Sequence, residues 1–374
     1  MDKDLSWPSL GDLVTAWIYR HCRQPDGPRR GQPFRLSDWQ FWIALNRWRI
    51  KPSAVFTPFA QVDDTHPLML NTAFTYRRTL IVGPQKLGKG PLTAAFVAAE
   101  AAGPTVFAGW AKEGDVYRCS EHGCPCGWSY RYRAGEPMGT QHPSPLIQLT
   151  ANSEEQTQNM YKPLQAMVLL GPLGKLLKVR EGFIRIVRPA INGASVDQLD
   201  LDRIDPVSSS AKSRIGNPVS DVEQDEAGLY TTSNSMFKVA EAQARGAAGM
   251  GGRTHLWTNA WDPTERSYAQ VQYEGASPDL FVFYRNPDLE PSLRHPDGTL
   301  FSFQKVKERR EILKFVYRGS PWVPLDSVDA EARELEKRDP AQAERFFGNR
   351  LVQGAGAWLD EGIWTSAYAG LEDA

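Results

Sequence analysis

The chain has 374 residues, 41% of them hydrophobic, so it can bury a substantial core as one large domain or two. A formal net charge of -1 excludes a global field that would hold a polyanion, so any nucleic-acid contact must come from local basic patches. Four cysteines are too few for a disulfide scaffold, and no basic-then-apolar leader opens the chain. No apolar run reaches the roughly 18 residues of a membrane span. We therefore expect a cytoplasmic protein.

Short apolar or β-branched runs alternate with helical patterns along most of the chain. The runs predict strands at residues 79–83, 105–109, 145–150, 183–188 and 255–259. Helical patterns lie at residues 37–48, 89–102, 153–169 and 235–248. This alternation favours an α/β fold with a mostly parallel central sheet between helices.

Two regions depart from the alternation. Residues 111–144 form a long insert with proline and glycine that interrupts the strand order. The segment after residue 300 is rich in charged helical sequence, such as "FQKVKERREILKF". We therefore predict a core domain over residues 1–300, which includes the insert, and a helical appendage over residues 301–374.

The stretch "TLIVGPQKLGKGPLTAAF" joins a predicted strand to a predicted helix through a glycine-rich loop. It matches the Gly-x-x-x-x-Gly-Lys pattern of a phosphate-binding loop, in which backbone N–H groups and the helix dipole bind phosphate oxygens and the lysine neutralises them. The alternative interpretation is a glycine-rich turn without a ligand. The predicted nucleotide-binding residues of the loop are Gly83, Gln85, Lys86, Gly88, Lys89 and Gly90.

Gly90 stands where such loops usually carry a serine or threonine that binds magnesium. Magnesium can keep several waters and take a carboxylate from elsewhere in the chain. Thr93, one helical turn further on, is a weak substitute. The loop therefore predicts nucleotide binding with an unusual magnesium site.

A carboxylate pair follows in "PVSDVEQDEAGLY". We expect Asp225 to hold magnesium and Glu226 to act as the base that polarises the attacking water. A central parallel strand is normally almost all apolar, whereas "SDVEQ" is polar. An exposed acidic turn is the alternative interpretation of this segment.

Four segments, matched in order and spacing, resemble the motifs of one family, the large terminase subunits of tailed bacteriophages, over about residues 34–360. "FRLSDWQFWIAL" resembles its adenine-binding segment, "PQKLGKG" its phosphate loop and "DEAGLY" its carboxylate motif. "WTNAWDP" resembles its coupling motif, in which Thr258 and Asn259 would sense the γ-phosphate. By the same resemblance Gln40 reads adenine, although Ser37 and Gln40 also form a capping box at a helix start.

The resemblance implies an additional-strand, RecA-like P-loop ATPase that uses ATP and magnesium to drive double-stranded DNA into a procapsid. The implied partners are DNA, a portal protein, the small terminase subunit and further copies of the chain. When assembled, the copies are expected to form a ring, a pentamer, and a monomer in isolation stays open. The implied location is the bacterial host cytoplasm, with transient docking on the portal. A nuclease domain follows the motor in this family, and we expect no DNA cleavage from these residues. A helicase or remodelling ATPase, and a nucleotide-binding module with weak hydrolysis, remain alternatives.

Where terminases have an arginine that acts on the neighbouring subunit, it precedes the carboxylate strand. Here "SSSAKSRIGNPVSDVEQDE" offers Lys212 and Arg214, and Arg214 is the better donor because its planar fork is bidentate. Both can instead be surface charges. The basic runs "KLLKVREGFIRIVR" and "KVKERREILK" are candidates for DNA contact, although their pattern favours a solvated helix face for each.

Outside these motifs, "YRCSEHGCPCGW" carries the ligand types of a structural zinc site. Two interpretations stay open, a zinc ion or a hairpin with reduced cysteines, because four ligands in one tight turn are hard to arrange tetrahedrally. The candidate ligands are Cys119, His122, Cys124 and Cys126.

Overall fold

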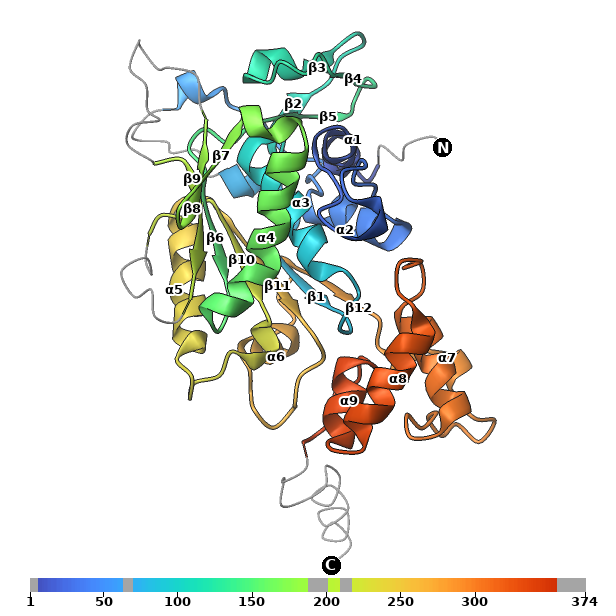
Figure 1. Cartoon of the computed structure of the whole chain (residues 1–374). Helices are drawn as coiled ribbons and strands as arrows, with labels where there is room; N and C mark the ends of the chain where they lie inside the picture. The colour runs from blue at the N-terminus through green and yellow to red at the C-terminus, as the bar shows by residue number, and fades with distance from the viewer. Residues whose placement is uncertain (1–5, 63–69, 188–200, 209–216, 355–374) are drawn as a thin grey trace, which may run out of the picture.

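The computed structural model describes residues 6–62, 70–187, 201–208 and 217–354. Its central sheet has eight strands in the order β12-β1-β11-β10-β6-β9-β8-β7 (Figure 1). Neighbours from β12 to β9 are parallel, and β8 and β7 continue the sheet in antiparallel pairing. This confirms the predicted α/β fold with a mostly parallel sheet. The strands are, in chain order, β1 (Arg78–Val82), β6 (Leu146–Thr150), β7 (Leu177–Arg180), β8 (Phe183–Ile186), β9 (Arg203–Val207), β10 (Asp221–Asp225), β11 (Arg253–Thr258) and β12 (Leu280–Tyr284).

Helices cover both faces of the sheet (Figure 1). On β1, Ile81 belongs to a core shared with α1 to α4, whereas Leu80 and Val82 belong to a core shared with α5 and α6. Strands buried on both faces explain the continuous apolar runs in the sequence. The α-helices are α1 (Gly11–His21), α2 (Asp38–Arg47), α3 (Lys89–Ala102), α4 (Glu154–Leu170), α5 (Met236–Gly249), α6 (Tyr268–Glu274), α7 (Val306–Val316), α8 (Leu325–Glu336) and α9 (Pro340–Phe346).

One predicted strand forms but lies outside the central sheet. The run at 105–109 becomes β2 (Val106–Trp110), which pairs antiparallel with β5 (Pro137–Thr140) of the insert. Within the insert, β3 (Val116–Arg118) and β4 (Ser129–Arg131) form a second small ribbon. The insert therefore supplies β2 with a partner of its own. Strands β7, β9 and β12 and helices α1 and α6 were not predicted from the sequence.

The polar strand β10 is central and fully buried, because other elements satisfy its charges. Asp221 accepts a hydrogen bond from the Arg47 guanidinium at 3.1 Å, and Glu223 forms an ion pair with the same guanidinium at 2.8 Å. Arg47 and Arg253 also contact Glu100 of α3, at 3.3 and 2.5 Å. Burial and the neighbouring charge of Asp221 raise the pKa of Glu223 to about 8, against the opposing effect of Arg47. This part of the segment is therefore no exposed acidic turn.

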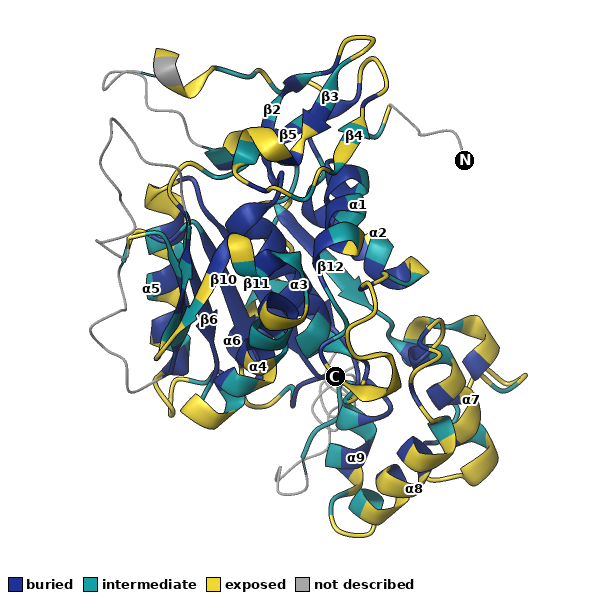
Figure 2. Cartoon of the chain, turned by 45° about the horizontal axis from the view of Figure 1, so that its top comes forward, coloured by how far each residue is buried: buried dark blue, intermediate teal, exposed yellow. Residues whose placement is uncertain are grey.

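Helices α7 to α9 lie beside the sheet, and α7 and α8 are largely exposed on their outer faces (Figures 1 and 2). A buried arginine joins the first two of these helices. Arg309 donates to Asp329 at 2.7 Å, to Glu336 at 2.9 Å and to the Phe303 carbonyl at 3.0 Å. Helical structure after residue 300 agrees with the sequence, while the domain boundary at that residue stays a prediction.

Candidate nucleotide-binding site

The glycine-rich loop leaves β1 at the carboxyl edge of the parallel sheet, where open α/β sheets bind their ligands. The Gly83 amide donates to the Thr258 carbonyl at 3.0 Å, which ties the loop to the end of β11. Lys86 and Gly88 have positive φ angles of 64° and 95°, so the loop turns sharply before α3 begins at Lys89. The predicted sequence of strand, loop and helix is therefore present.

The Lys89 ammonium lies inside this loop. It donates to the carbonyls of Gly83 and Pro84 at 2.7 and 3.1 Å and to Asn259 Oδ1 at 2.7 Å. Burial lowers its pKa, and the nearby charges of Glu226 and Asp225 oppose that effect. The lysine therefore bridges the loop and the segment after β11.

The two predicted carboxylates follow one another at the end of β10. Asp225 is the last strand residue, paired in register with Trp257, and Glu226 leaves the strand with a φ of 56°. Burial and the charge of Glu226 raise the pKa of Asp225 to about 7, although Lys89 opposes the shift. Three of the predicted site residues thus meet at this edge of the sheet.

Asn259 and Thr258 connect the carboxylates to the loop. Asn259 Nδ2 donates to Glu226 Oε2 at 3.0 Å while its Oδ1 accepts from Lys89. The Gly228 amide donates to Thr258 Oγ1 at 2.9 Å. One amide side chain therefore touches both the lysine and the glutamate, while its role toward a phosphate stays a prediction.

Steric crowding explains why position 90 is a glycine. A Cβ built there would lie 2.5 Å from the Asn159 backbone carbonyl oxygen of α4, closer than two such atoms approach. Thr93 is buried, and its hydroxyl donates to the Lys89 carbonyl at 3.0 Å. Close packing of α4 on α3 thus excludes a serine at the usual magnesium position.

Gln40 is buried in the first turn of α2, and its Oε1 accepts from the Ser37 amide at 2.9 Å. The capping contact is therefore present, and the adenine-binding role of Gln40 stays a prediction. The preceding Trp39 packs against Trp322, whose Nε1 donates to the Leu87 carbonyl of the loop at 3.2 Å. These contacts connect the start of α2 to the loop.

The segment after residue 300 also contacts the loop. The Gln85 amide donates to the Phe346 carbonyl at 2.8 Å, and the Gln85 carbonyl accepts from the Tyr317 hydroxyl at 2.7 Å. The loop is thus held from outside by the helical segment as well as by the sheet. Sequence patterns within the loop contain no signal for these contacts.

A cavity of about 130 Å³ opens beside Glu226 and Asn259. Arg345 of α9 and Asp262 line it and form an ion pair at 3.0 Å. Asp262 belongs to the segment "WTNAWDP", but nothing in the sequence pointed to Arg345, because only the fold brings α9 to this edge. The cavity lining offers one cation, three carboxylates and two side-chain amides around one polar space.

Two other predictions have different outcomes. Arg214, with Lys212, lies outside the described residues. In the cysteine cluster the structure corrects the predicted fourth ligand, because the histidine that joins Cys119, Cys124 and Cys126 is His21. The ring of His122 instead stacks on Tyr117 with 4.6 Å between ring centroids.

In the part of the chain that the structure describes, we find no helix long and apolar enough to cross a membrane. The described architecture is that of an α/β protein in which a glycine-rich loop of the P-loop pattern joins the end of β1 to α3 at the carboxyl edge of a mostly parallel sheet.

Comparison with known proteins agrees with this class. No family model matches the chain. It is 23% identical over 392 aligned positions to a Gene 13 protein of Mycobacterium phage D29, which covers 96% of this chain and 58% of that protein. A Gene 13 protein of Mycobacterium phage L5 is likewise 23% identical, with 97% and 59% covered.

Among solved structures, the large terminase of bacteriophage HK97 is similar, with a TM-score of 0.55 and 15% sequence identity. The match covers 92% of this chain and 55% of the terminase chain. The chain thus spans a little over half the length of the proteins that it resembles. The resemblance to phage large terminases is thereby confirmed for the fold.

Proposed function

We propose that these residues are the ATPase motor of a phage large terminase, in which ATP hydrolysis drives translocation of double-stranded DNA into a procapsid. The observation that carries the proposal is the junction at the carboxyl edge, where Asn259 touches both Lys89 and Glu226. The fold shared with the HK97 large terminase supports the same function.

Each group has a proposed role. The loop amides and Lys89 bind the phosphates, once the ammonium exchanges its bonds to the loop carbonyls for phosphate oxygens. Asp225 supports magnesium, and Glu226 orients and deprotonates the attacking water. Thr258 and Asn259 respond to the γ-phosphate, and Gln40 reads adenine.

Phosphate release from ATP and magnesium, with and without double-stranded DNA, tests the proposal. We expect hydrolysis in the parent protein, stimulation by DNA, and loss of hydrolysis in Lys89→Ala. Binding of a fluorescent ATP analogue to a folded Lys89→Ala variant separates lost chemistry from lost structure. A parent protein that binds no nucleotide, or a fully active Lys89→Ala variant, would rule the proposal out.

A nucleotide-binding module with weak hydrolysis is the second candidate. The specific observation in its favour is Gly90, because Asn159 leaves no room there for a hydroxyl that binds magnesium. In that case the parent binds ATP with magnesium but releases phosphate no faster than Glu226→Gln does. Unwinding of a duplex in place of translocation would favour the remaining alternative, a helicase or remodelling ATPase.

The motor is proposed to work as a ring on a portal protein, together with the small terminase subunit. Arg214 would complete the site of the neighbouring subunit, where an arginine can raise the rate by a factor of about a thousand or more. Specific activity should then rise with protein concentration, and Arg214→Ala should remove that rise at nearly unchanged nucleotide affinity. A rate independent of concentration under assembling conditions contradicts this part.

A further inference from the structure

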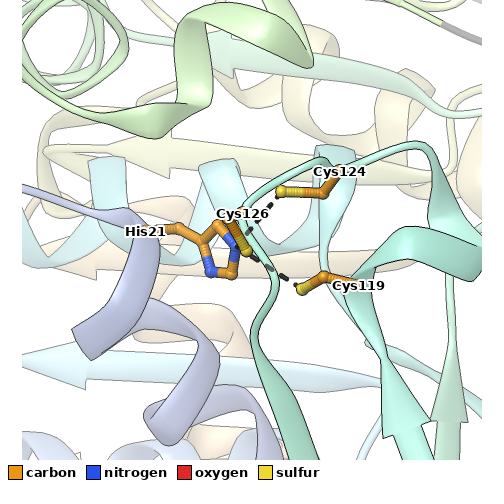
Figure 3. Close-up of side chains that lie close together, drawn as sticks. All are labelled: His21, Cys119, Cys124 and Cys126. Carbon is orange, nitrogen blue, oxygen red and sulfur yellow. Dashed lines mark hydrogen bonds between the residues drawn. The ribbon is translucent and has the colours of Figure 1, made fainter.

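Three cysteines of the insert and one histidine of α1 point toward one another (Figure 3). The histidine is far from the cysteines in sequence but adjacent to them in the fold. His21 Nε2 lies 3.5 Å from the Sγ atoms of Cys119 and Cys124 and 3.3 Å from that of Cys126. All four atoms lie within 4.8 Å of one another. The cluster is separate from the nucleotide site and contains none of its residues.

These distances match the edges of a metal-centred tetrahedron. With zinc–sulfur bonds of about 2.3 Å and zinc–nitrogen bonds of about 2.0 Å, ligand sulfur and nitrogen atoms lie about 3.5 Å apart. A hydrogen bond alone does not explain the arrangement, because a neutral imidazole nitrogen has one lone pair and can accept from one thiol. Three sulfurs around one nitrogen therefore indicate a shared cation.

Contacts within α1 set the tautomer and the orientation of the His21 ring. His21 Nδ1 lies 2.8 Å from the Trp17 carbonyl, which only accepts, so Nδ1 carries the proton. The lone pair of Nε2 then points to the sulfurs. A backbone carbonyl on the other ring nitrogen is the usual support of a metal-bound histidine. The Trp17 ring stacks on the imidazole at 4.3 Å and fixes its plane.

The cysteines also have the surroundings of metal ligands. Cys119 and Cys124 are buried, and the Trp128 amide donates to Cys126 Sγ at 3.4 Å, a contact that stabilises a thiolate. The Arg20 guanidinium donates to the Cys126 carbonyl at 2.9 Å, so α1 holds the same loop twice. The cluster thus joins the insert to the N-terminal helix.

We propose that His21, Cys119, Cys124 and Cys126 bind one structural zinc ion that fastens the insert to α1. Four protein ligands complete the tetrahedron and leave no position for a substrate, which is the pattern of structural zinc sites. The tight turn need not supply all four ligands, because the fourth comes from α1, 98 residues before Cys119.

The test is the metal content of the purified parent protein, measured by mass spectrometry after dialysis with zinc and then without it. We expect about one zinc ion per chain, and a lower melting temperature after removal of zinc by a chelator. Binding of cobalt in place of zinc should produce a thiolate-to-metal absorption band. No stoichiometric zinc in the folded parent, or a Cys119–Cys124 disulfide found by peptide mapping, overturns the proposal.

Paired variants test the ligand assignment. His21→Ala and Cys124→Ser should lose the zinc, whereas His122→Ala and Cys22→Ala should keep it, although His122 lies in the same loop and Cys22 directly follows His21. Should the ligand variants fail to fold, the parent measurement and the two control variants still decide the matter. Loss of zinc in His122→Ala but not in His21→Ala contradicts the assignment. ATP hydrolysis plays no part in these measurements, so they succeed or fail independently of the proposed motor function.

Discussion

Strand β10 carries one carboxylate pair at its start and middle, and a second pair lies where the strand ends; the two pairs have opposite surroundings. At its start and middle, Asp221 and Glu223 meet Arg47, which binds both at 3.1 Å or less. At its end, the charge of Asp225 and Glu226 is opposed by Lys89, which is itself bonded to the loop and to Asn259. The first pair is neutralised by the protein and supports the fold. The second pair faces a single lysine that also donates to the loop carbonyls and to Asn259, and it includes the carboxylate proposed to hold magnesium.

The largest expected effect is the loss of stability when Arg47, the partner of the first carboxylate pair, is replaced. Arg47→Met leaves the carboxylates of Asp221 and Glu223 buried without their shared cation, which should lower the free energy of unfolding by about 3–5 kcal/mol. Urea denaturation measures it. Lys89→Met is the matched control and should cost much less, because Lys89 is only half-buried, whereas Arg47 is 1% exposed and also contacts the carboxylate of Glu100. Equal losses in the two variants would show that the two ends do not differ.

The second prediction addresses the catalytic end. Glu226→Gln should lower the rate of ATP hydrolysis by a factor of about 10²–10⁴, the usual contribution of a general base, at nearly unchanged nucleotide affinity and stability. Single-turnover phosphate release measures the rate. Glu265→Gln is the control, since Glu265 lines the same cavity but is exposed and lies off β10. A Glu226→Gln variant as fast as the parent would remove the glutamate from the mechanism.

The third prediction concerns pH. Glu223 has a pKa of about 8 in the folded chain against 4.5 for an ordinary glutamate, so the folded state keeps a proton that the unfolded state has released. Its contribution to stability is complete below pH 4.5 and is lost as pH rises to about 8. Glu223→Gln should therefore show a flatter dependence of unfolding free energy on pH across this interval. Parallel curves for parent and variant would contradict the assignment.

The smallest expected effect is a loss of stability when Gly90, in the helix that follows the loop, is replaced by alanine. Gly90→Ala forces α3 away from the Asn159 carbonyl and should lower the free energy of unfolding by about 1–3 kcal/mol. Gly249→Ala, at the end of α5 with open space around it, should be neutral or stabilising. Thermal denaturation compares the two. Gly90→Ser should likewise fail to raise hydrolysis, and a faster Gly90→Ser variant would mean that the position can accept the magnesium hydroxyl.

The sequence by itself determined the elements that depend on local patterns. The helix predicted at 89–102 begins and ends at Lys89 and Ala102, because alanine-rich sequence after a glycine turn favours a helix wherever it is packed. The loop, the carboxylates at the end of β10 and the segment after β11 were predicted from motif order, and parallel strands bring such ends to one edge.

Only the tertiary structure decided which distant groups meet. Arg47 makes a polar strand acceptable in the middle of the sheet, and Asn159 explains Gly90, yet neither lies near its partner in sequence. The strand predicted at 105–109 lies outside the central sheet, because it pairs with a strand of the insert instead. His21 replaced His122 in the cysteine cluster for the same physical reason: side-chain charge, hydrogen bonding and coordination act through space, and local patterns carry no record of which remote residue the fold brings near.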